Sequence, residues 1–562
     1  ARDRLDIGAD TINNSGHSIM FSCGDVAIVC SLDATKHATG QATTLNNDSA
    51  TIEAIGSADI NAKTVNNTNQ NFSTTTENLA AQSITEYQGS GSPNRYTPGT
   101  PDVYAYNDES DHLHTPEGNY ESWSAYNYTR NTSETRVASS DPAQITSGGA
   151  MRITADTVNN DKSRIIAGGT LTGTIGTLNN TEVAGERVTT DAGSVTSYWR
   201  DHHKGRDSTG SSSAGYNPAP TIQAISLTPT VYQQNTASSG SGAQVAALST
   251  ATFNQTPGAA SSATGTTQGG QVITPITQVV AATSSGASGP VTVVRSGGIN
   301  TSVPNNGLLG LAPGSTAHFL IETDPAFANY RTWLSSDYLL NALSLDPALT
   351  QKRLGDGFYE QKLIREQVAQ LTGRRFLDGY ANDEAQYAAL MNSGVTFAQS
   401  YNLVPGIALS AAQMAQLTND IVWLVEKDIT LPNGTTTKAL VPQLYVHVRE
   451  GDLQAGGALI AGNNVNLNIT GNLLNGGTIA GRQVVALTAD NINNLGGRIL
   501  GADVGVAART DLNNIGGTIG ANNNLVASAG RDLNVASNTR AQKNEQGSQT
   551  NIERVAGLYV TG

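Results

Sequence analysis

Residues 476–495 read GGTIAGRQVVALTADNINNL, and residues 496–515 read GGRILGADVGVAARTDLNNI. The two segments align without a gap, because a pair of glycines recurs every 20 residues from Gly456 to Gly516. Each unit continues with three short runs in which apolar and polar residues alternate, separated by Gly and Asn. An apolar residue stands two positions after each glycine pair, at Leu459, Ile479, Ile499 and Ile519.

A repeat of this length is typical of a solenoid. Leucine-rich repeats have a similar period, but they need a Leu-x-x-Leu-x-Leu run that these units lack. The sequence therefore predicts a mostly β fold, a right-handed parallel β-helix with about 20 residues per coil. Gly and Asn are expected at the corners, where they adopt left-handed backbone conformations. The predicted inward ladder consists of Leu459, Ile479, Ile499 and Ile519.

The same pattern recurs nearer the N-terminus, where an apolar residue is followed by two asparagines at Ile12, Val65, Val158 and Leu178. We therefore expect coils over residues 1–68, 145–204 and 446–562, interrupted by segments of different composition. A solenoid gains nothing from an inserted domain unless its axis must stop, turn or be capped there, and a compact α+β domain is expected to cover the exposed strand edges of end coils. The coils before and after the interruption are thus expected to form separate stacks.

The first interruption, residues 69–144, concentrates tyrosine and tryptophan in a chain that is 5% aromatic. Alternation over residues 123–129 predicts strands, so we expect an extension that projects from one coil. Two interpretations remain open: the aromatic side chains pack the extension against the coils, or some of them are exposed anchors for a partner. The candidate receptor-binding residues are Tyr104, Tyr106, Tyr120, Trp123, Tyr126 and Tyr128.

Residues 205–310 are rich in Gly, Ser and Thr, a composition that cannot bury enough apolar surface to fold compactly. They predict an extended strap that runs beside the solenoid. Two apolar islands within it, residues 276–280 and 291–294, are expected to add isolated strands along the solenoid.

Residues 311–445 predict a small α+β domain. A helix is expected over residues 356–372, where a glycine ends the apolar periodicity. A second helix is expected to begin at Ser410, whose Gln413 completes a capping box and whose apolar residues continue at helical spacing to Leu424. Residues 431–434 predict a hairpin turn.

The composition and motifs disfavour several classes of function. Charged residues make up 14% of the chain and its net charge is −14, which disfavours nucleic acid because phosphate contacts require clustered Lys and Arg. The sequence has no G-x-S-x-G, Walker or H-E-x-x-H motif, so no catalytic residue and no cofactor is predicted. His112 and His114 share one face of a predicted strand. Since spacing fixes no third ligand, a solvated loop is preferred to a metal site.

Cys23 and Cys30 are too few for a disulfide scaffold and lack CxxC spacing. A local disulfide across one turn and two buried free thiols both remain open. No run of about 18 apolar residues is present, so no membrane span is predicted. Residues 1–13 lack the features of a signal peptide and read as the middle of a longer protein, so the chain is expected to be a fragment.

Two segments of the predicted α+β domain, YRTWLSSDY at 330–338 and LTQKRLGDGFYEQ at 349–361, resemble the large haemagglutinin-repeat exoproteins. This family comprises the filamentous haemagglutinins and the CdiA effectors of contact-dependent growth inhibition. With the flanking repeats, the resemblance covers essentially the whole chain, and the strap is its weakest part. It implies that residues 311–445 are a tyrosine–proline-rich domain and that residues 446–562 begin the second haemagglutinin-repeat region.

The resemblance also implies a function. The chain is expected to be part of a cell-surface filament, exported across the outer membrane of a Gram-negative bacterium by two-partner secretion. Its implied partners are an outer-membrane secretion transporter, engaged by an amino-terminal region outside this chain, and an outer-membrane receptor, protein or lipopolysaccharide, on neighbouring bacteria. Receptor recognition would support delivery of a carboxy-terminal toxin that also lies outside the chain, so the chain itself is not expected to be an enzyme. The alternative is a host-cell adhesin of the filamentous haemagglutinin type.

Overall fold

The computed structural model of the protein describes residues 1–106, 112–227, 332–449 and 457–561, with short segments between them. These segments are 231–235, 244–247, 266–268, 271–273, 276–280, 293–299, 301, 303–304, 307–312, 318–328 and 452. Much of the predicted strap at 205–310 and the side chain of Tyr106 therefore lie outside the described residues.

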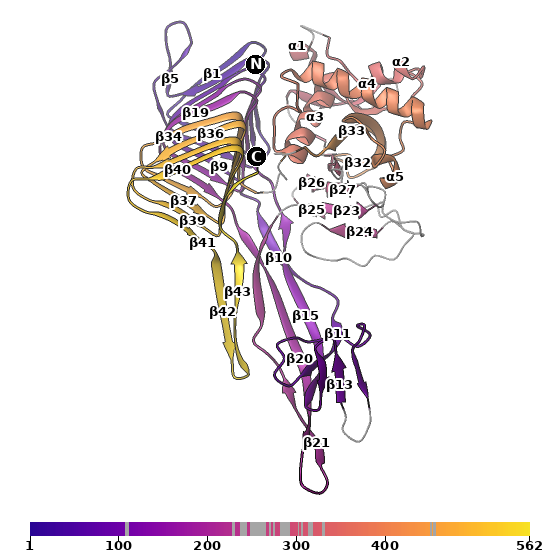
Figure 1. Ribbon diagram of the computed structural model, residues 1–562. Coiled ribbons are helices and arrows are strands. Elements are labelled where there is room, and N and C mark those ends of the chain that lie inside the picture. Colours follow the sequence, from indigo (N-terminus) through magenta and orange to yellow (C-terminus); the bar gives the residue numbers. More distant parts are fainter. Residues whose placement is uncertain are drawn as a thin grey trace.

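A single parallel β-helix forms the body of the molecule (Figure 1). Its first coil consists of β1 (Arg4–Gly8), β2 (Thr11–Ser15) and β3 (Ile19–Ser22). These strands pair in parallel with β4 (Asp25–Val29), β7 (Ala42–Asp48) and β8 (Thr51–Ala54) of the second coil. The later coils are built from β9 (Ala58–Thr68), β16 (Gln144–Ser147), β17 (Met151–Asp161), β18 (Arg164–Ala167), β19 (Thr170–Thr181), β34 (Leu459–Ile469), β35 (Asn472–Asn475), β36 (Thr478–Ala489), β37 (Asn491–Leu495), β38 (Arg498–Ala508), β39 (Leu512–Ile515), β40 (Thr518–Ala529), β41 (Leu533–Ala536) and β44 (Gly557–Val560). The predicted mostly β, parallel β-helical fold is confirmed.

Apolar side chains stack inside the coils and form one continuous core. Ile479, Ile499 and Ile519 are fully buried and lie in register with one another. The prediction for the fourth ladder position is wrong, because Ile460 rather than Leu459 pairs with Ile479. A shift of one residue along a strand moves a side chain to the opposite face. Leu459 is buried outside the coil, in a cluster with Ala369 of the inserted domain.

Two columns of asparagine side chains run along the stack. In the inner column the buried amide nitrogens from Asn14 to Asn494 donate to the amide oxygen of the next coil, as from Asn47 Nδ2 to Asn67 Oδ1 at 2.8 Å, and the nitrogen of Asn514 donates to the Gly557 carbonyl. The inner column consists of Asn14, Asn47, Asn67, Asn160, Asn180, Asn475, Asn494 and Asn514. The outer column, one position earlier, is more exposed and has the opposite donor direction, as from Asn179 Nδ2 to Asn159 Oδ1 at 2.9 Å. Both columns supply partners for polar groups at the corners.

The inserted segments do not divide the stack. β19, which precedes them, pairs in parallel with β34 and β35, which follow them. The expectation of two separate stacks is therefore wrong. The points where the chain leaves and returns lie side by side, since the Ala458 N–H donates to the Glu182 carboxylate. Because the ends of the insertion meet, the parallel pairing continues across it without interruption.

The inserted α+β domain contains one main sheet and several helices. Its helices are α1 (Pro325–Ala328), α2 (Asp337–Ala342), α3 (Gly357–Thr372), α4 (Asp383–Tyr401) and α5 (Ala411–Met414). Its strands are β27 (Ile276–Val280), β28 (Val293–Ser296), β29 (Leu309–Leu311), β30 (Phe319–Thr323), β31 (Arg353–Gly355), β32 (Ile421–Thr430) and β33 (Thr436–His447), and β23 (Val231–Asn235) and β24 (Gln244–Ala247) extend the same sheet. Three pairs of strands form separate two-stranded sheets: β5 (Ser31–Leu32) with β6 (Ala38–Thr39), β25 (Thr266–Gln268) with β26 (Gln271–Ile273), and β42 (Asn538–Asn544) with β43 (Gly547–Arg554).

α3 matches the predicted helix. The Asp356 carboxylate accepts the Tyr359 N–H at 3.0 Å, and Gly373 ends the helix with φ of 67°, a conformation that glycine adopts without strain. β32 and β33 form the predicted hairpin, with Thr430 paired to Thr436.

Two other predictions for this region are wrong. The capping box of Ser410 is present, but α5 ends at Met414, and the residues from Ile421 onward form β32 instead of continuing the helix. β-branched residues open this strand, and pairing with β33 outweighs the helical spacing. The island at 276–280 forms β27, and the island at 291–294 contributes the start of β28. β28 pairs with β27 and β33, so both extend the domain's sheet rather than the solenoid.

Candidate functional site

An antiparallel sheet, which we call the extension, projects from the β-helix (Figure 1). Its long strands β15 (Trp123–Ser139) and β20 (Ala184–Asp201) pair with each other. β10 (Ser73–Asn78) and β11 (Gln82–Gly89) pair with β15, whereas β21 (Ser208–Tyr216) and β22 (Thr221–Ser226) pair with β20. A small sheet of β12 (Tyr104–Tyr106), β13 (His112–Thr115) and β14 (Gly118–Tyr120) packs beside them.

The extension is built from two parts of the chain, only one of which the sequence predicts. Residues 184–201 were expected within the coils of 145–204, yet β20 lacks the Gly-Gly and Asn-Asn corners and runs straight for 18 residues. Residues 208–226, expected in the strap beside the solenoid, form β21 and β22 of the same sheet. The coils before the insertion therefore end at Thr181.

The extension has its own core, separate from that of the coils. The Trp123 and Tyr198 rings stack with centroids 4.4 Å apart, and Tyr87 meets Trp123 edge to face at 5.3 Å. Leu113 of the small sheet is fully buried against them. Aromatic pairs in these geometries add stability beyond the area that they bury, so the extension is a packed unit rather than an isolated hairpin.

Paired charges brace the base of the extension. The Glu134 carboxylate is buried between the guanidinium groups of Arg136, at 2.9 Å, and Arg187. Nearer its middle, Arg130 donates twice to Asp191, at 2.8 Å each, and this pairing raises the pKa of Arg130. Such bidentate pairs fix the geometry of the strands that carry them.

The candidate receptor-binding residues differ in exposure. Trp123 and Tyr128 are buried, and burial raises the pKa of Tyr128 to about 12. For these two residues the packing interpretation holds, and they cannot act as exposed anchors. Tyr120 and Tyr126 are half-buried. Tyr104 is 53% exposed.

Two exposed aromatic groups mark the surface of the extension. The Tyr104 ring stacks on the His114 imidazole with centroids 4.8 Å apart. Trp199, which the sequence analysis did not single out, is 38% exposed and lies across Gly210, where a Cβ atom would approach its ring to 2.6 Å. The alternation of β20 around Tyr198 and Trp199 is the signal that could have identified this strand.

The histidines make local contacts with carboxylates. His112 Nε2 lies 3.5 Å from Glu121, and His202 lies between Glu121 at 2.7 Å and Asp207 at 2.9 Å. Hydrogen bonds to Glu121, and then to Asp207, raise the pKa of His202. Within the described residues, no group of three His, Cys, Asp or Glu side chains is placed to hold a metal ion.

Neither Cys23 nor Cys30 forms a disulfide. β4 separates them with five extended residues, which span more than the Cα separation that a disulfide tolerates. Cys23 packs against the core of the inserted domain, whereas Cys30 packs against the core of the coils. The local disulfide is therefore not formed.

The inserted domain docks on the flank of the β-helix, with α3 facing the coils (Figure 1). Phe21 of β3 meets Phe358 of α3 edge to face at 5.2 Å. Beside this contact Arg365 Nε lies 2.7 Å from the Glu53 carboxylate of β8. The expectation that the domain caps the ends of coils is wrong, because its contacts fall on their sides.

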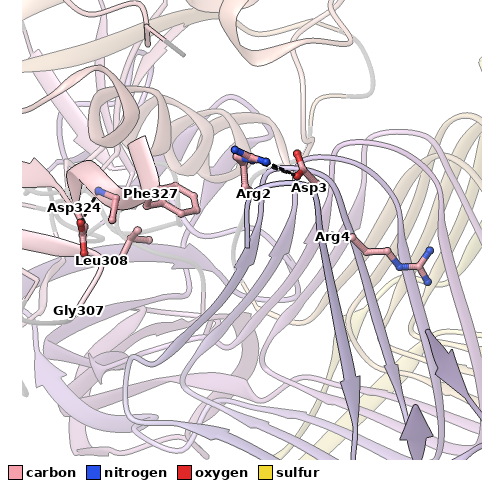
Figure 2. A pocket seen from close by; sticks show the side chains of 8 residues that line it. Arg2, Asp3, Arg4, Gly307, Leu308, Asp324 and Phe327 are labelled. Carbon is pink, nitrogen blue, oxygen red and sulfur yellow. Dashed lines mark hydrogen bonds and ion pairs between the residues drawn. The ribbon is translucent and has the colours of Figure 1, made fainter. Parts of the chain in front are cut away.

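A cavity of about 770 Å³ opens between the first coil and the inserted domain (Figure 2). It is lined by Arg2, Asp3, Arg4, Gly307, Leu308, Asp324, Ala326 and Phe327. The charged groups in it have partners close by: Arg2 lies 3.1 Å from Asp3, and Arg4 lies 2.6 Å from Asp6. We therefore assign no ligand to this cavity.

The chain is similar to parts of several CdiA proteins. "Toxin CdiA" of Yersinia pestis is 45% identical over 163 residues, which are 29% of this chain and 5% of that protein. "tRNA nuclease CdiA-2" of Burkholderia pseudomallei is 38% identical over 195 residues, or 35% of this chain and 6% of that protein. "Toxin CdiA" of Escherichia coli is 34% identical over 191 residues, or 33% and 6% of the two chains. The chain thus spans only a small part of the length of these relatives.

No protein-family model and no solved structure matches the chain. None of the helices in its described part is long and apolar enough to cross a membrane. The similarity to the CdiA proteins confirms the CdiA part of the predicted resemblance, over about a third of the chain rather than essentially all of it. The chain is a relative of the CdiA proteins, with which it shares about a third of its length.

Proposed function

We propose that this chain is a segment of a cell-surface filament whose extension recognises an outer-membrane receptor, protein or lipopolysaccharide, on neighbouring bacteria. In this proposal the filament is exported by two-partner secretion and supports delivery of a toxin that lies outside the chain, and the chain itself is not catalytic. The relatives are named as toxins and a tRNA nuclease, which supports the proposal that the chain belongs to a protein that delivers a toxin.

The extension is the observation that carries the proposal. Two segments far apart in the sequence leave the β-helix to build a sheet with a core of its own, so the stability of the coils does not account for it. The sheet presents Tyr104 and Trp199 to solvent. Tyr and Trp are the residues in which binding energy most often concentrates.

Removal of the extension tests the proposal. Both of its segments must be deleted, because deleting residues 72–138 alone leaves β20 without β15. The ends can be closed with short Gly linkers: the Asn71 carbonyl accepts from Ser139 at 2.7 Å, and Ala184 pairs with Ser226. The purified variant should retain the β-rich circular dichroism of the coils and lose attachment to target bacteria. Unchanged attachment refutes the proposal.

A finer test uses point variants. Tyr104→Ala combined with Trp199→Ala should weaken attachment about tenfold or more, as expected for loss of two exposed aromatic anchors. The matched control is Tyr401→Ala, an aromatic residue of α4 that is 43% exposed and lies outside the extension. It should bind as the unaltered chain does. Attachment to animal host cells but not to bacteria would instead support the adhesin.

A further inference from the structure

A second hairpin, formed by β42 and β43, leaves the last coils and lies beside the extension (Figure 1). It departs after β41, turns back at Asn544 and Gly547, and rejoins the stack as β44, in register with β40. None of the apolar clusters found among the described residues contains a residue of this hairpin. Side-chain hydrogen bonds and an ion pair connect it to the extension.

Side-chain amides of the hairpin donate hydrogen bonds to the end of β21 and to the connection between β21 and β22. Gln546 Nε2 donates to the Gly215 carbonyl at 2.9 Å, and Asn544 Nδ2 donates to the Asn217 carbonyl at 2.8 Å. Gln549 Nε2 donates to the Ala219 carbonyl at 2.8 Å. The three acceptors stand at alternate positions, which is the spacing at which carbonyls of an extended chain point to the same side.

The sequence of this connection explains why it needs such partners. Pro218 and Pro220 interrupt it, and proline has no N–H to offer a neighbouring strand. The segment cannot form an ordinary strand ladder, yet its carbonyl groups still require donors. The hairpin supplies them from side chains. It also accepts the Asn217 N–H with Gln546 Oε1 at 2.5 Å.

An ion pair also joins the hairpin to the extension, at a point nearer the β-helix. Arg540 of β42 lies 2.7 Å from Glu186 of β20, a residue 354 positions earlier in the sequence. Both side chains are substantially exposed. Polar contacts therefore link the last coils to the extension at two places along its length.

We propose that the β42–β43 hairpin is a clasp that sets the orientation of the extension relative to the β-helix. The extension joins the coils covalently through three short links, after β9, before β16 and after β19, and its last strand, β22, precedes β23 of the inserted domain in the chain. A second contact, farther along the extension, restricts the angle between the extension and the β-helix. Because the clasp is polar and exposed to solvent, it can open without unfolding either element.

Distances between two spin labels measure this angle. One label is placed at Thr209 in β21 and the other at Asn491 in β37, in a chain carrying Cys23→Ser and Cys30→Ser. The test variant combines Asn544→Ala, Gln546→Ala and Gln549→Ala. The control combines Lys543→Ala, Ser548→Ala and Thr550→Ala, exposed residues of the same hairpin. The test variant should broaden the distance distribution, and the control should leave it unchanged.

Hydrogen exchange gives a second readout that does not depend on the labels. Exchange of the Asn217 amide should accelerate about tenfold or more in the test variant, while amides of β15 stay protected. Glu186→Gln removes the ion pair across the contact and should also widen the distribution, while Arg540 keeps its contact with Glu553 inside the hairpin at 3.3 Å. An unchanged distribution and unchanged Asn217 exchange in the test variant overturn the proposal. Neither readout requires a receptor, so the outcome is independent of the proposed function.

Discussion

Asn180 and Asn475 are 295 positions apart, yet the Asn180 side-chain nitrogen donates to the Asn475 side-chain oxygen at 2.8 Å. Both side chains are fully buried. The bond has the same length and donor direction as the one from Asn160 to Asn180, which lie in consecutive coils. The joint across the insertion is therefore equivalent to a step between neighbouring coils.

The inner asparagine column should contribute more to stability than the outer one. Asn160→Ala leaves the buried Asn67 nitrogen and Asn180 oxygen without their side-chain partner, and we expect a loss of about 2–4 kcal/mol in the free energy of unfolding. Asn159→Ala, one position earlier and more exposed, should cost less than about 1 kcal/mol. Thermal unfolding of the two variants makes the comparison, and equal losses would contradict it.

A charge inside the coils should disrupt them locally. Ile499 is fully buried, and Ile499→Asp removes its packing and places an unpaired carboxylate among apolar side chains. Because each coil contacts mainly its neighbours, hydrogen exchange should rise in β36, β38 and β40 first. Val526→Asp changes a residue of β40 that is 65% exposed and should be tolerated. Full protection in the Ile499 variant would refute the assignment of this side chain to the core.

The docked domain should depend on a buried cluster of charges. Glu53 on the coil and Asp383 on α4 lie between Arg365 and Arg375, and all four side chains are at least nine-tenths buried. In Glu53→Gln the guanidinium groups of Arg365 and Arg375 keep only one buried carboxylate, that of Asp383, as a counter-charge. We therefore expect the docked state to be destabilised by about 3–5 kcal/mol. Limited proteolysis of α3 should accelerate.

An exposed ion pair on the same coils provides the control for this prediction. Asp59 pairs with Arg152, and both side chains are largely exposed. Asp59→Asn should change stability by no more than about 1 kcal/mol. If both variants protect α3 equally from protease, the buried cluster does not hold the domain in place.

Glu360 should make the inserted domain sensitive to pH. It is fully buried, accepts the Ser336 N–H at 2.6 Å and the Tyr387 hydroxyl at 3.1 Å, and burial raises its pKa to about 7. The pKa of an unfolded glutamate is about 4.3. Between these values the folded state holds a proton that the unfolded state has lost. Stability from this group is therefore fully present below about pH 4.3 and falls as the pH rises to about 7.

Glu360→Gln should remove that slope, because glutamine is neutral throughout. The difference in the free energy of unfolding between the variant and the unaltered chain should change by about 3 kcal/mol from pH 4 to pH 8, in favour of the variant. Denaturant unfolding at the two values measures the difference. Glu322→Gln, at an exposed carboxylate of the same domain, should retain the original pH dependence. A Glu360→Gln variant with that same dependence would show that another group causes it.

Repetition made the coils predictable, since the period of 20 residues fixes strands, corners and core together. The register predicted from the repeat fails at Leu459, beside the insertion. The strand there is shifted by one residue, so Ile460 pairs with Ile479 and Leu459 packs against Ala369 instead. The glycine pairs alone could not reveal that offset. Pairing with Ile479 decides the register, and pairing is a property of the stacked coils.

The extension was only half predictable for a different reason. The aromatic segment stands out by composition, but its partner strand β20 consists of residues such as Thr, Ser and Val that also occur in the coils. Its pairing with β15 and the contact of Trp123 with Tyr198 show where β20 belongs, and both are properties of the folded structure. The buried carboxylate of Glu360 was missed because its partners Ser336 and Tyr387 lie on other helices, and spacing within one helix carries no trace of them.

The joint between Asn180 and Asn475 has a kinetic consequence. Consecutive coils bring together residues about one repeat apart, so a plain solenoid has a low contact order and zips from coil to coil. At this joint the next coil can pair only after a loop of 295 residues has closed. The entropic cost of closing a loop grows with the logarithm of its length, so this joint costs about 2 kcal/mol more than a step of one repeat. The same cost slows the folding step that forms the joint. The coils up to Thr181 and those from Leu459 should fold as two early units, and their union should be the slow final phase.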